Sequence, residues 1–152
     1  MRRRCIEPDT VAKLAQVPNI IGIKDSGDLQ NTIEIIRNTP REKLVLNGRD
    51  TLILAARTPG AQGAIPASCN IAGIRVGIYE SFRKGDWEAA KGFQSRLHPV
   101  RMAMSLGTGN GAIKEALTLL GRSCGPNRSP ISPLADDKKA KLKSILTGAG
   151  LL

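Results

Sequence analysis

The sequence predicts an α/β protein whose strands run parallel. Three short apolar runs have the length and composition of buried strands, and they lie at residues 19–24, 44–47 and 63–66. Helical patterns separate the runs, and strands that alternate with helices imply right-handed crossovers between parallel strands. The runs do not alternate between apolar and polar residues, which is typical of strands covered on both faces.

Helices are expected before the first strand and after each strand. Residues 8–15 fit a short helix with a proline in its first turn. Asp28 closes a predicted turn and is a good N-cap for a helix that ends before Pro40. Asp50 is expected to cap the helix that follows the second strand.

The remainder of the chain is predicted to be helical. Helices are expected over residues 71–84, 87–105, 112–120 and 136–146. Asp86 is the expected cap of the second of these, and the three prolines within residues 121–133 predict a loop. We therefore expect an α/β domain over residues 1–85 and a helical extension over residues 86–152.

Composition and charge argue against several classes of function. The formal charge is +10, but the basic residues are spread along the chain, with clusters only at residues 2–4 and 138–143. Neither cluster is interleaved with aromatic residues, so we expect no nucleic-acid partner. No apolar stretch approaches the roughly 20 residues of a membrane helix, and the basic start leads into no apolar segment of a secretory signal.

Metal and nucleotide cofactors are not expected either. His98 is the only histidine and has no nearby ligand set. Cys5, Cys69 and Cys124 form no CxxC pair, which predicts free thiols in a reducing cytoplasm. No strand is followed by GxGxxG or by a P-loop, and the sequence GTGNG at residues 107–111 lies between helices.

The residues alone leave the sheet topology open. Three strands fit a doubly wound sheet or part of a barrel, and a closed (β/α)8 barrel needs about 250 residues. Six motifs decide between them: IIGIKDSGDL (20–29), LNGRD (46–50), GAQGAIPASCNI (60–71), YESFRKGDWEAAK (79–91), AIKEALTLLG (112–121) and RSPISPL (128–134). In this order and spacing they resemble the dihydrodipicolinate synthase/N-acetylneuraminate lyase family, whose members are pyruvate-dependent class I aldolases.

The resemblance implies a partial TIM barrel. Family members are (β/α)8 barrels with a C-terminal helical extension, and the matching motifs belong to the second part of their chain. Residues 1–85 would supply strands six to eight with their helices, and residues 86–152 a three-helix extension. Strands one to five, with their proton-transferring tyrosine and threonines, have no counterpart in this sequence.

Lys24 is the expected catalytic residue. In the family, the lysine of the GIKD motif forms a Schiff base with pyruvate at the C-terminal mouth of strand six. An amine attacks a carbonyl only when it is unprotonated, and burial in a barrel mouth favours the neutral amine. Without the resemblance, a lysine at a strand end that reaches into solvent is the simpler interpretation.

The substrate-binding residues follow from the ends of the next two strands. Gly48 would let the backbone approach the ligand closely, and Gly63 and Ile65 match positions that line the family's pyruvate site. Pro66 stands where the family more usually has serine or glycine. The capping role of Asp50 competes with a substrate-side role like that in the sugar-acid lyases.

The resemblance predicts a lyase that condenses pyruvate with aspartate semialdehyde in lysine biosynthesis, a 4-hydroxy-tetrahydrodipicolinate synthase-like activity without a cofactor. Two alternatives remain: a sugar-acid aldolase that acts on N-acetylneuraminate or a 2-keto-3-deoxy acid, and an inactive basic helical fragment. Because half of the barrel is absent from the sequence, we expect little turnover. We also expect either self-association or pairing with a separate N-terminal half.

Overall fold

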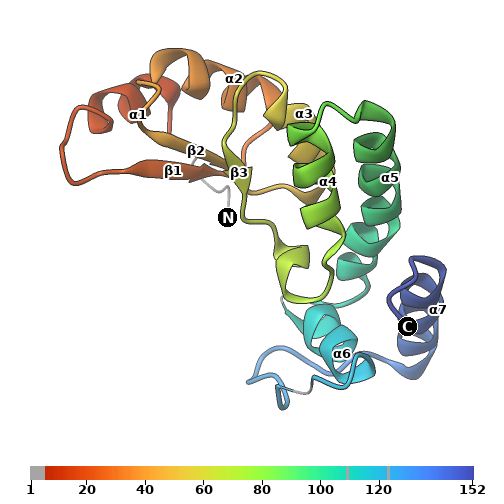
Figure 1. Cartoon of the computed structure of the whole chain (residues 1–152). Helices are drawn as coiled ribbons and strands as arrows, with labels where there is room; N and C mark the ends of the chain where they lie inside the picture. The colour runs from red at the N-terminus through yellow and green to blue at the C-terminus, as the bar shows by residue number, and fades with distance from the viewer. Residues whose placement is uncertain (1–5, 109, 123) are drawn as a thin grey trace. The chain divides into compact units, whose positions relative to one another are not determined.

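A computed structural model describes residues 6–108, 110–122 and 124–152. The chain divides into two compact units, one ending at Pro66 and the other running from Ala67 to Leu152. This division by packing comes earlier in the chain than the domain boundary expected after residue 85. That boundary stays a prediction. Figure 1 shows the course of the chain through both units.

The first unit holds a three-stranded parallel sheet. Its strands are β1 (Gly22–Asp25), β2 (Leu44–Asn47) and β3 (Gly63–Ala64), in the order β1-β2-β3. The predicted α/β class with parallel strands is thereby confirmed. The second strand has the predicted bounds, whereas β1 begins at residue 22 rather than 19 and β3 ends at residue 64 rather than 66.

Helices of the first unit begin close to the predicted positions. They are α1 (Pro8–Leu14), α2 (Leu29–Asn38), the 3₁₀ helix η1 (Asp50–Leu52) and α3 (Ile53–Arg57). The Asp28 carboxylate accepts a hydrogen bond of 2.8 Å from the Asn31 amide, so the predicted N-cap of α2 is confirmed.

Asp50 does not occupy the predicted cap position. The chain enters the helical segment through a 3₁₀ turn, so Asp50 is the first residue of η1, and Leu52 is the N-cap of α3. The Asp50 side chain is buried, with 2% of its surface exposed. The prediction failed because a 3₁₀ turn, which carries no distinct sequence signal, precedes the α-helix.

The sheet is covered by helices of its own unit on one face. Val11 of α1, Ile35 of α2 and Val45 of β2 form a buried cluster, with Ile23 and Ile36 packed against it. Both α1 and α2 lie on this side of the strands (Figure 1). On the strands' other face, Leu44 of β2 is 39% exposed. The apolar runs predicted cover on both faces, and the first unit by itself supplies it on one.

Every regular element described in the second unit is a helix. This unit contains η2 (Ala67–Asn70), α4 (Ile74–Arg83), α5 (Trp87–Ala103), η3 (Met104–Leu106), α6 (Gly111–Leu119) and α7 (Asp136–Gly148). Asp86 caps α5 as predicted, because its carboxylate accepts a 3.0 Å hydrogen bond from the Ala89 amide. Three α-helices thus follow α4, in agreement with the expected extension.

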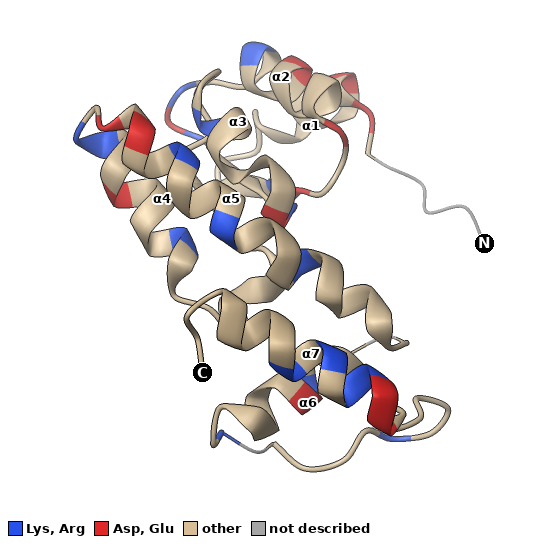
Figure 2. Ribbon diagram, turned by 90° about the vertical axis from the view of Figure 1, so that its right-hand side faces the viewer, with Lys and Arg blue, Asp and Glu red and all other residues tan. Residues whose placement is uncertain are grey.

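A small set of fully buried side chains holds these helices together. Ile78 of α4, Leu97 of α5, and Leu142 and Leu146 of α7 have no exposed surface. Lysine and arginine residues are spread over several helices, and α7 carries both acidic and basic residues (Figure 2). Among the described helices, none combines the length and the apolar character needed to cross a membrane.

Gly77 is expected to be the most sensitive position between α4 and α5. A Cβ atom at residue 77 would lie 2.7 Å from three ring atoms of Phe93. Gly77→Ala should therefore lower the melting temperature, because overpacking costs about 1–3 kcal/mol and outweighs a helix-propensity gain of about 0.5–1 kcal/mol. Thermal denaturation followed by circular dichroism measures this.

Gly92→Ala in α5 is the matched control. A Cβ atom at residue 92 meets no heavy atom within 4 Å. This variant gains helix propensity without the clash, so its melting temperature should equal or exceed that of the wild type. A stabilised Gly77→Ala variant would contradict the packing described here.

Candidate active site

Lys24 lies one residue before the C-terminal end of β1. It is in register with Leu46 of β2, which is in register with Gly63 of β3. Register partners in a parallel sheet project from the same face. The three residues therefore form one row across the sheet, on the face opposite the buried helix cluster.

Gly48 follows β2 directly and lies against the lysine side chain. A Cβ atom at residue 48 would be 2.9 Å from Lys24 Cε and 2.1 Å from Ser26 Oγ. The Gly48 amide also donates a 2.6 Å hydrogen bond to the carbonyl oxygen of Asp25. Glycine is needed here because two strand ends meet closely. The structure thus brings together two of the four residues that the sequence analysis selected.

Gly63 and Ile65 belong to the third strand and its continuation. Strand β2 separates them from Lys24 in the sheet order. The Ile65 amide donates a 2.8 Å hydrogen bond to the carbonyl oxygen of Asn47, so backbone pairing extends past β3. The Ile65 side chain is 47% exposed and offers an apolar surface. Their role in substrate binding stays a prediction.

Asp25 projects from the opposite face of β1 and is 7% exposed. Its Oδ1 accepts hydrogen bonds from the Gly27 amide (2.9 Å) and Asn31 Nδ2 (3.2 Å), and its Oδ2 accepts one of 2.5 Å from Thr32 Oγ1. Three donors satisfy this buried carboxylate. These hydrogen bonds hold the end of β1, which carries Lys24, against the first turns of α2.

The sequence analysis missed this network. The predicted first strand ended at residue 24 and left Asp25 outside it, whereas the structure places Asp25 in the strand. The available signal was the alternation of side chains along a strand. If Lys24 projects from one face of the sheet, the next residue of the strand projects from the other face.

The turns after β1 and β2 are tied to each other. Arg49 Nε donates a 2.9 Å hydrogen bond to the carbonyl oxygen of Ser26. The fully buried Asn47 accepts a 2.9 Å hydrogen bond at Oδ1 from the Arg49 amide. Lys24 and Gly48 therefore lie between two turns that are joined by a hydrogen bond. This feature was not predicted, since nothing in the NGRD motif indicates which backbone group the arginine contacts.

The Lys24 side chain is exposed in this structure. The expected dry environment of the amine is therefore not provided by the described residues of this chain. The side chain projects from the sheet face that the first unit leaves uncovered. Burial of Lys24 would therefore require another surface to cover this face of the sheet.

Within residues 6–108, 110–122 and 124–152, no group of three or more His, Cys, Asp or Glu side chains is placed to hold a metal ion. Cys69 and Cys124 are free thiols, and Cys5 lies outside the described residues.

Comparison with known proteins identifies the family. The sequence pattern of the Dihydrodipicolinate synthetase family matches residues 3–149. A 4-hydroxy-tetrahydrodipicolinate synthase from Methanoculleus marisnigri is 38% identical over 148 residues, which is 95% of this chain and 51% of that protein. This chain spans about half the length of the curated relatives it matches.

Solved structures show the same fold. YagE from Escherichia coli K12, a member of the dihydrodipicolinic acid synthase family crystallised with pyruvate, superposes with a TM-score of 0.89 at 34% identity. The match covers 96% of this chain and 52% of YagE. Dihydrodipicolinate synthase DapA-2 from Bacillus anthracis has a TM-score of 0.89 at 29% identity over 93% of this chain and 49% of its own. The chain therefore belongs to the dihydrodipicolinate synthetase family.

Proposed function

We propose that Lys24 captures pyruvate as a Schiff base in a lyase of the 4-hydroxy-tetrahydrodipicolinate synthase type. The observation that carries this proposal is the position of Lys24 against Gly48, at the C-terminal ends of adjacent parallel strands. Barrel enzymes keep their catalytic residues at this end of the strands. The names of the relatives reported above favour the synthase over a sugar-acid aldolase.

The chemistry begins at the nitrogen of Lys24. The neutral amine attacks the C2 carbonyl of pyruvate, water leaves, and a C=N bond forms. The iminium accepts the electron pair released when the pyruvate methyl group loses a proton. The resulting enamine carbon attacks the aldehyde carbon of aspartate semialdehyde, and the aldehyde oxygen takes up a proton. The amino group of the same substrate then adds to the C=N carbon and displaces the Lys24 nitrogen as the free amine.

The remaining groups position this nitrogen. The Asp25 network fixes the strand end, and Gly48 leaves room for the lysine stem. We place β1, β2 and β3 at strands six to eight of a (β/α)8 barrel, with Gly63 and Ile65 lining the keto-acid site. The proton-transferring residues then lie in the other half, and such groups typically contribute about 10²–10⁴-fold in rate. The free thiols fit action in a reducing cytoplasm.

Borohydride trapping tests the proposal. The chain is incubated with pyruvate and borohydride, alone and with the portion of the Methanoculleus marisnigri synthase that it does not match. Mass spectrometry of the digested chain should locate a pyruvate-derived adduct on Lys24 when both polypeptides are present. The chain alone should trap little pyruvate, because Lys24 is exposed on a sheet face that the first unit leaves uncovered.

Lysine-to-arginine variants complete the design. Lys24→Arg should lose the adduct entirely, because a guanidinium cannot form the imine. Lys84→Arg, which changes an exposed lysine at the end of α4, should leave trapping unchanged. Equal labelling of Lys24 and the other lysines would overturn the proposed function.

A further inference from the structure

A cleft opens at the N-terminal end of β2, away from Lys24. Lys43 directly precedes this strand, Val45 is its second residue, and both line the cleft. Gly48, against which the Lys24 side chain lies, follows the other end of the same strand. The cleft is therefore separated from the candidate active site by the length of β2, and the proposed chemistry makes no use of it.

The walls of this cleft come from the ends of α2 and α3. Ile36 belongs to the last turn of α2, and Pro59 and Gly60 lie in the turn after α3. A Cβ atom at residue 60 would lie 3.5 Å from Ile36 Cγ2, so this turn packs closely against the helix. The cleft has a volume of about 490 Å³. Sites for small molecules have volumes of roughly 300–1,000 Å³, so the cleft has room for such a ligand.

Gln62 fixes another side of the cleft. Its Oε1 accepts a 2.8 Å hydrogen bond from the Val45 amide, and its Nε2 donates one of 3.3 Å to the carbonyl oxygen of Lys43. The side chain is thus held against the backbone at the start of β2. The shape of the cleft is therefore set by the fold itself, as is usual for ligand sites.

Three basic residues line the cleft. They are Arg37 in the last turn of α2, Arg41 in the loop that follows, and Lys43. No aspartate or glutamate is among the described residues that line it. Within the described part of the chain, neither guanidinium group makes a hydrogen bond or an ion pair. Positive charge that is gathered in a cleft without a carboxylate partner favours an anionic ligand.

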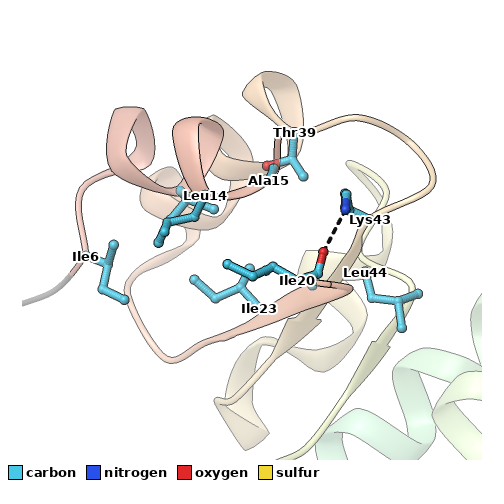
Figure 3. Close-up of a pocket in the computed structure, with 10 residues that line it drawn as sticks. Ile6, Leu14, Ala15, Ile20, Ile23, Thr39, Lys43 and Leu44 are labelled. Atoms are coloured by element: carbon cyan, nitrogen blue, oxygen red, sulfur yellow. Dashed lines mark hydrogen bonds between the residues drawn. The ribbon is translucent and has the colours of Figure 1, made fainter. Parts of the chain in front are cut away.

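The two arginines are the groups available for direct contact. Lys43 Nζ already donates hydrogen bonds of 2.7 Å to the carbonyl oxygen of Ile20 and 3.2 Å to that of Val17. Figure 3 shows the first of these bonds. Lys43 therefore contributes a fixed positive charge, whereas the exposed guanidinium groups of Arg37 and Arg41 are free to bind an anion.

The pair of arginines favours a phosphate over a carboxylate. The planar fork of a guanidinium group fits the oxygen atoms of a phosphate and can form two parallel hydrogen bonds with it. A phosphate ester carries about 1.5–2 negative charges at pH 7 and can be shared by two guanidinium groups, whereas a single carboxylate carries one. The apolar walls provided by Ile36 and Pro59 suit an organic group attached to that phosphate.

We propose that this cleft binds a small organic phosphate, with the phosphate group between Arg37 and Arg41 and the organic part against Ile36 and Pro59. All of these residues belong to the first unit. The site gives the chain a second ligand, bound at the end of β2 that lies away from Lys24. It goes beyond the proposed function and does not depend on the chemistry of Lys24.

Calorimetric titration of the 152-residue chain tests the proposal. The probes are phenyl phosphate, inorganic phosphate and phenol. Phenyl phosphate should bind most tightly, because it offers both an anion and an apolar ring; inorganic phosphate should bind more weakly, and phenol should not bind. In NMR spectra, phenyl phosphate should shift the amide signals of residues 36–45 and 59–62. Shifts spread over the basic residues of the whole chain, without a preference for phenyl phosphate, would overturn the proposal.

Arginine variants locate the phosphate group. Arg37→Gln and Arg41→Gln should each weaken the binding of phenyl phosphate about tenfold, because each removes charge-assisted hydrogen bonds. Both residues are exposed, so circular dichroism should show an unchanged fold. Arg83→Gln is the matched control, since Arg83 is also exposed in the last turn of its helix, α4, but lies outside the cleft. Wild-type affinity in the double variant of Arg37 and Arg41 would contradict the proposed site.

Two further measurements separate this inference from other interpretations. Lys24→Arg should bind phenyl phosphate as the wild type does while it traps no pyruvate, so the proposed function and the phosphate site can fail independently. A poly-aspartate peptide should not displace phenyl phosphate. Displacement by the peptide, with shifts at the same amides, would overturn the proposal and assign the cleft to an acidic protein partner.

Discussion

Gly48→Ala is expected to slow pyruvate capture at Lys24 by about 10²-fold, the cost typical of displacing a reacting group by about 1 Å. The new Cβ atom would lie 2.1 Å from Ser26 Oγ, 2.9 Å from Lys24 Cε and 3.0 Å from the Asp25 carbonyl oxygen. One of these neighbours is backbone, so rotation of a side chain cannot relieve the whole conflict. The rate of borohydride-trapped adduct formation, measured with the complementary half present, checks this.

Two other glycine-to-alanine variants serve as comparisons for the loss of pyruvate capture in Gly48→Ala. A Cβ atom at Gly63 would meet Leu46 Cδ2 at 3.2 Å, a contact that a flexible side chain can relieve, so Gly63→Ala should have a smaller effect. A Cβ atom at Gly73 meets nothing within 4 Å, and Gly73→Ala should trap pyruvate at the wild-type rate. If Gly48→Ala also matched the wild type, Lys24 would not need the close approach described here.

Ile35→Ala is expected to produce the largest loss of stability in the first unit. Ile35 is fully buried between α1 and the sheet, in the cluster with Val11 and Val45. Removing its side chain leaves a cavity where the helices meet the strands, and such truncations cost about 2–5 kcal/mol in free energy of unfolding. Urea titration, with hydrogen exchange of β1 and β2 peptides as the local readout, measures the loss.

Ile21→Ala is the matched control. Ile21 lies directly before β1 and is 73% exposed, so its truncation removes little buried surface. We expect its free energy of unfolding to stay within about 0.5 kcal/mol of the wild-type value. Comparable losses for the two isoleucines would show that the helix-facing cluster is not the core of this unit.

Much of the α/β architecture could be predicted because it follows from local patterns. Apolar runs bounded by turn residues located the strands, and Asp28 and Asp86 located two helix starts through their capping chemistry. The lysine that ends an apolar run was the clearest functional signal. Gly48, which lies against this lysine in the structure, was selected from the LNGRD motif. These features depend on residues close together in the sequence.

Features that depend on tertiary contacts could not be predicted. The burial of Asp25 requires Asn31 and Thr32 from the next helix, and the pattern of the strand alone leaves that partner set undefined. The apolar runs predicted that both faces of the sheet are covered. They did not indicate what covers the face opposite α1 and α2. Asp50 shows the same limit, because a 3₁₀ turn displaced it from the cap position.

The alternation of Lys24 and Asp25 across β1 restricts how the preceding loop can change during evolution. A register slip of one residue would exchange the two side chains, because successive residues of a strand face opposite ways. The ammonium group would then meet the Thr32 hydroxyl among the helices, and the carboxylate would stand beside Gly48. Insertions and deletions between α1 and β1 are therefore tolerated only when the loop absorbs them without moving the strand.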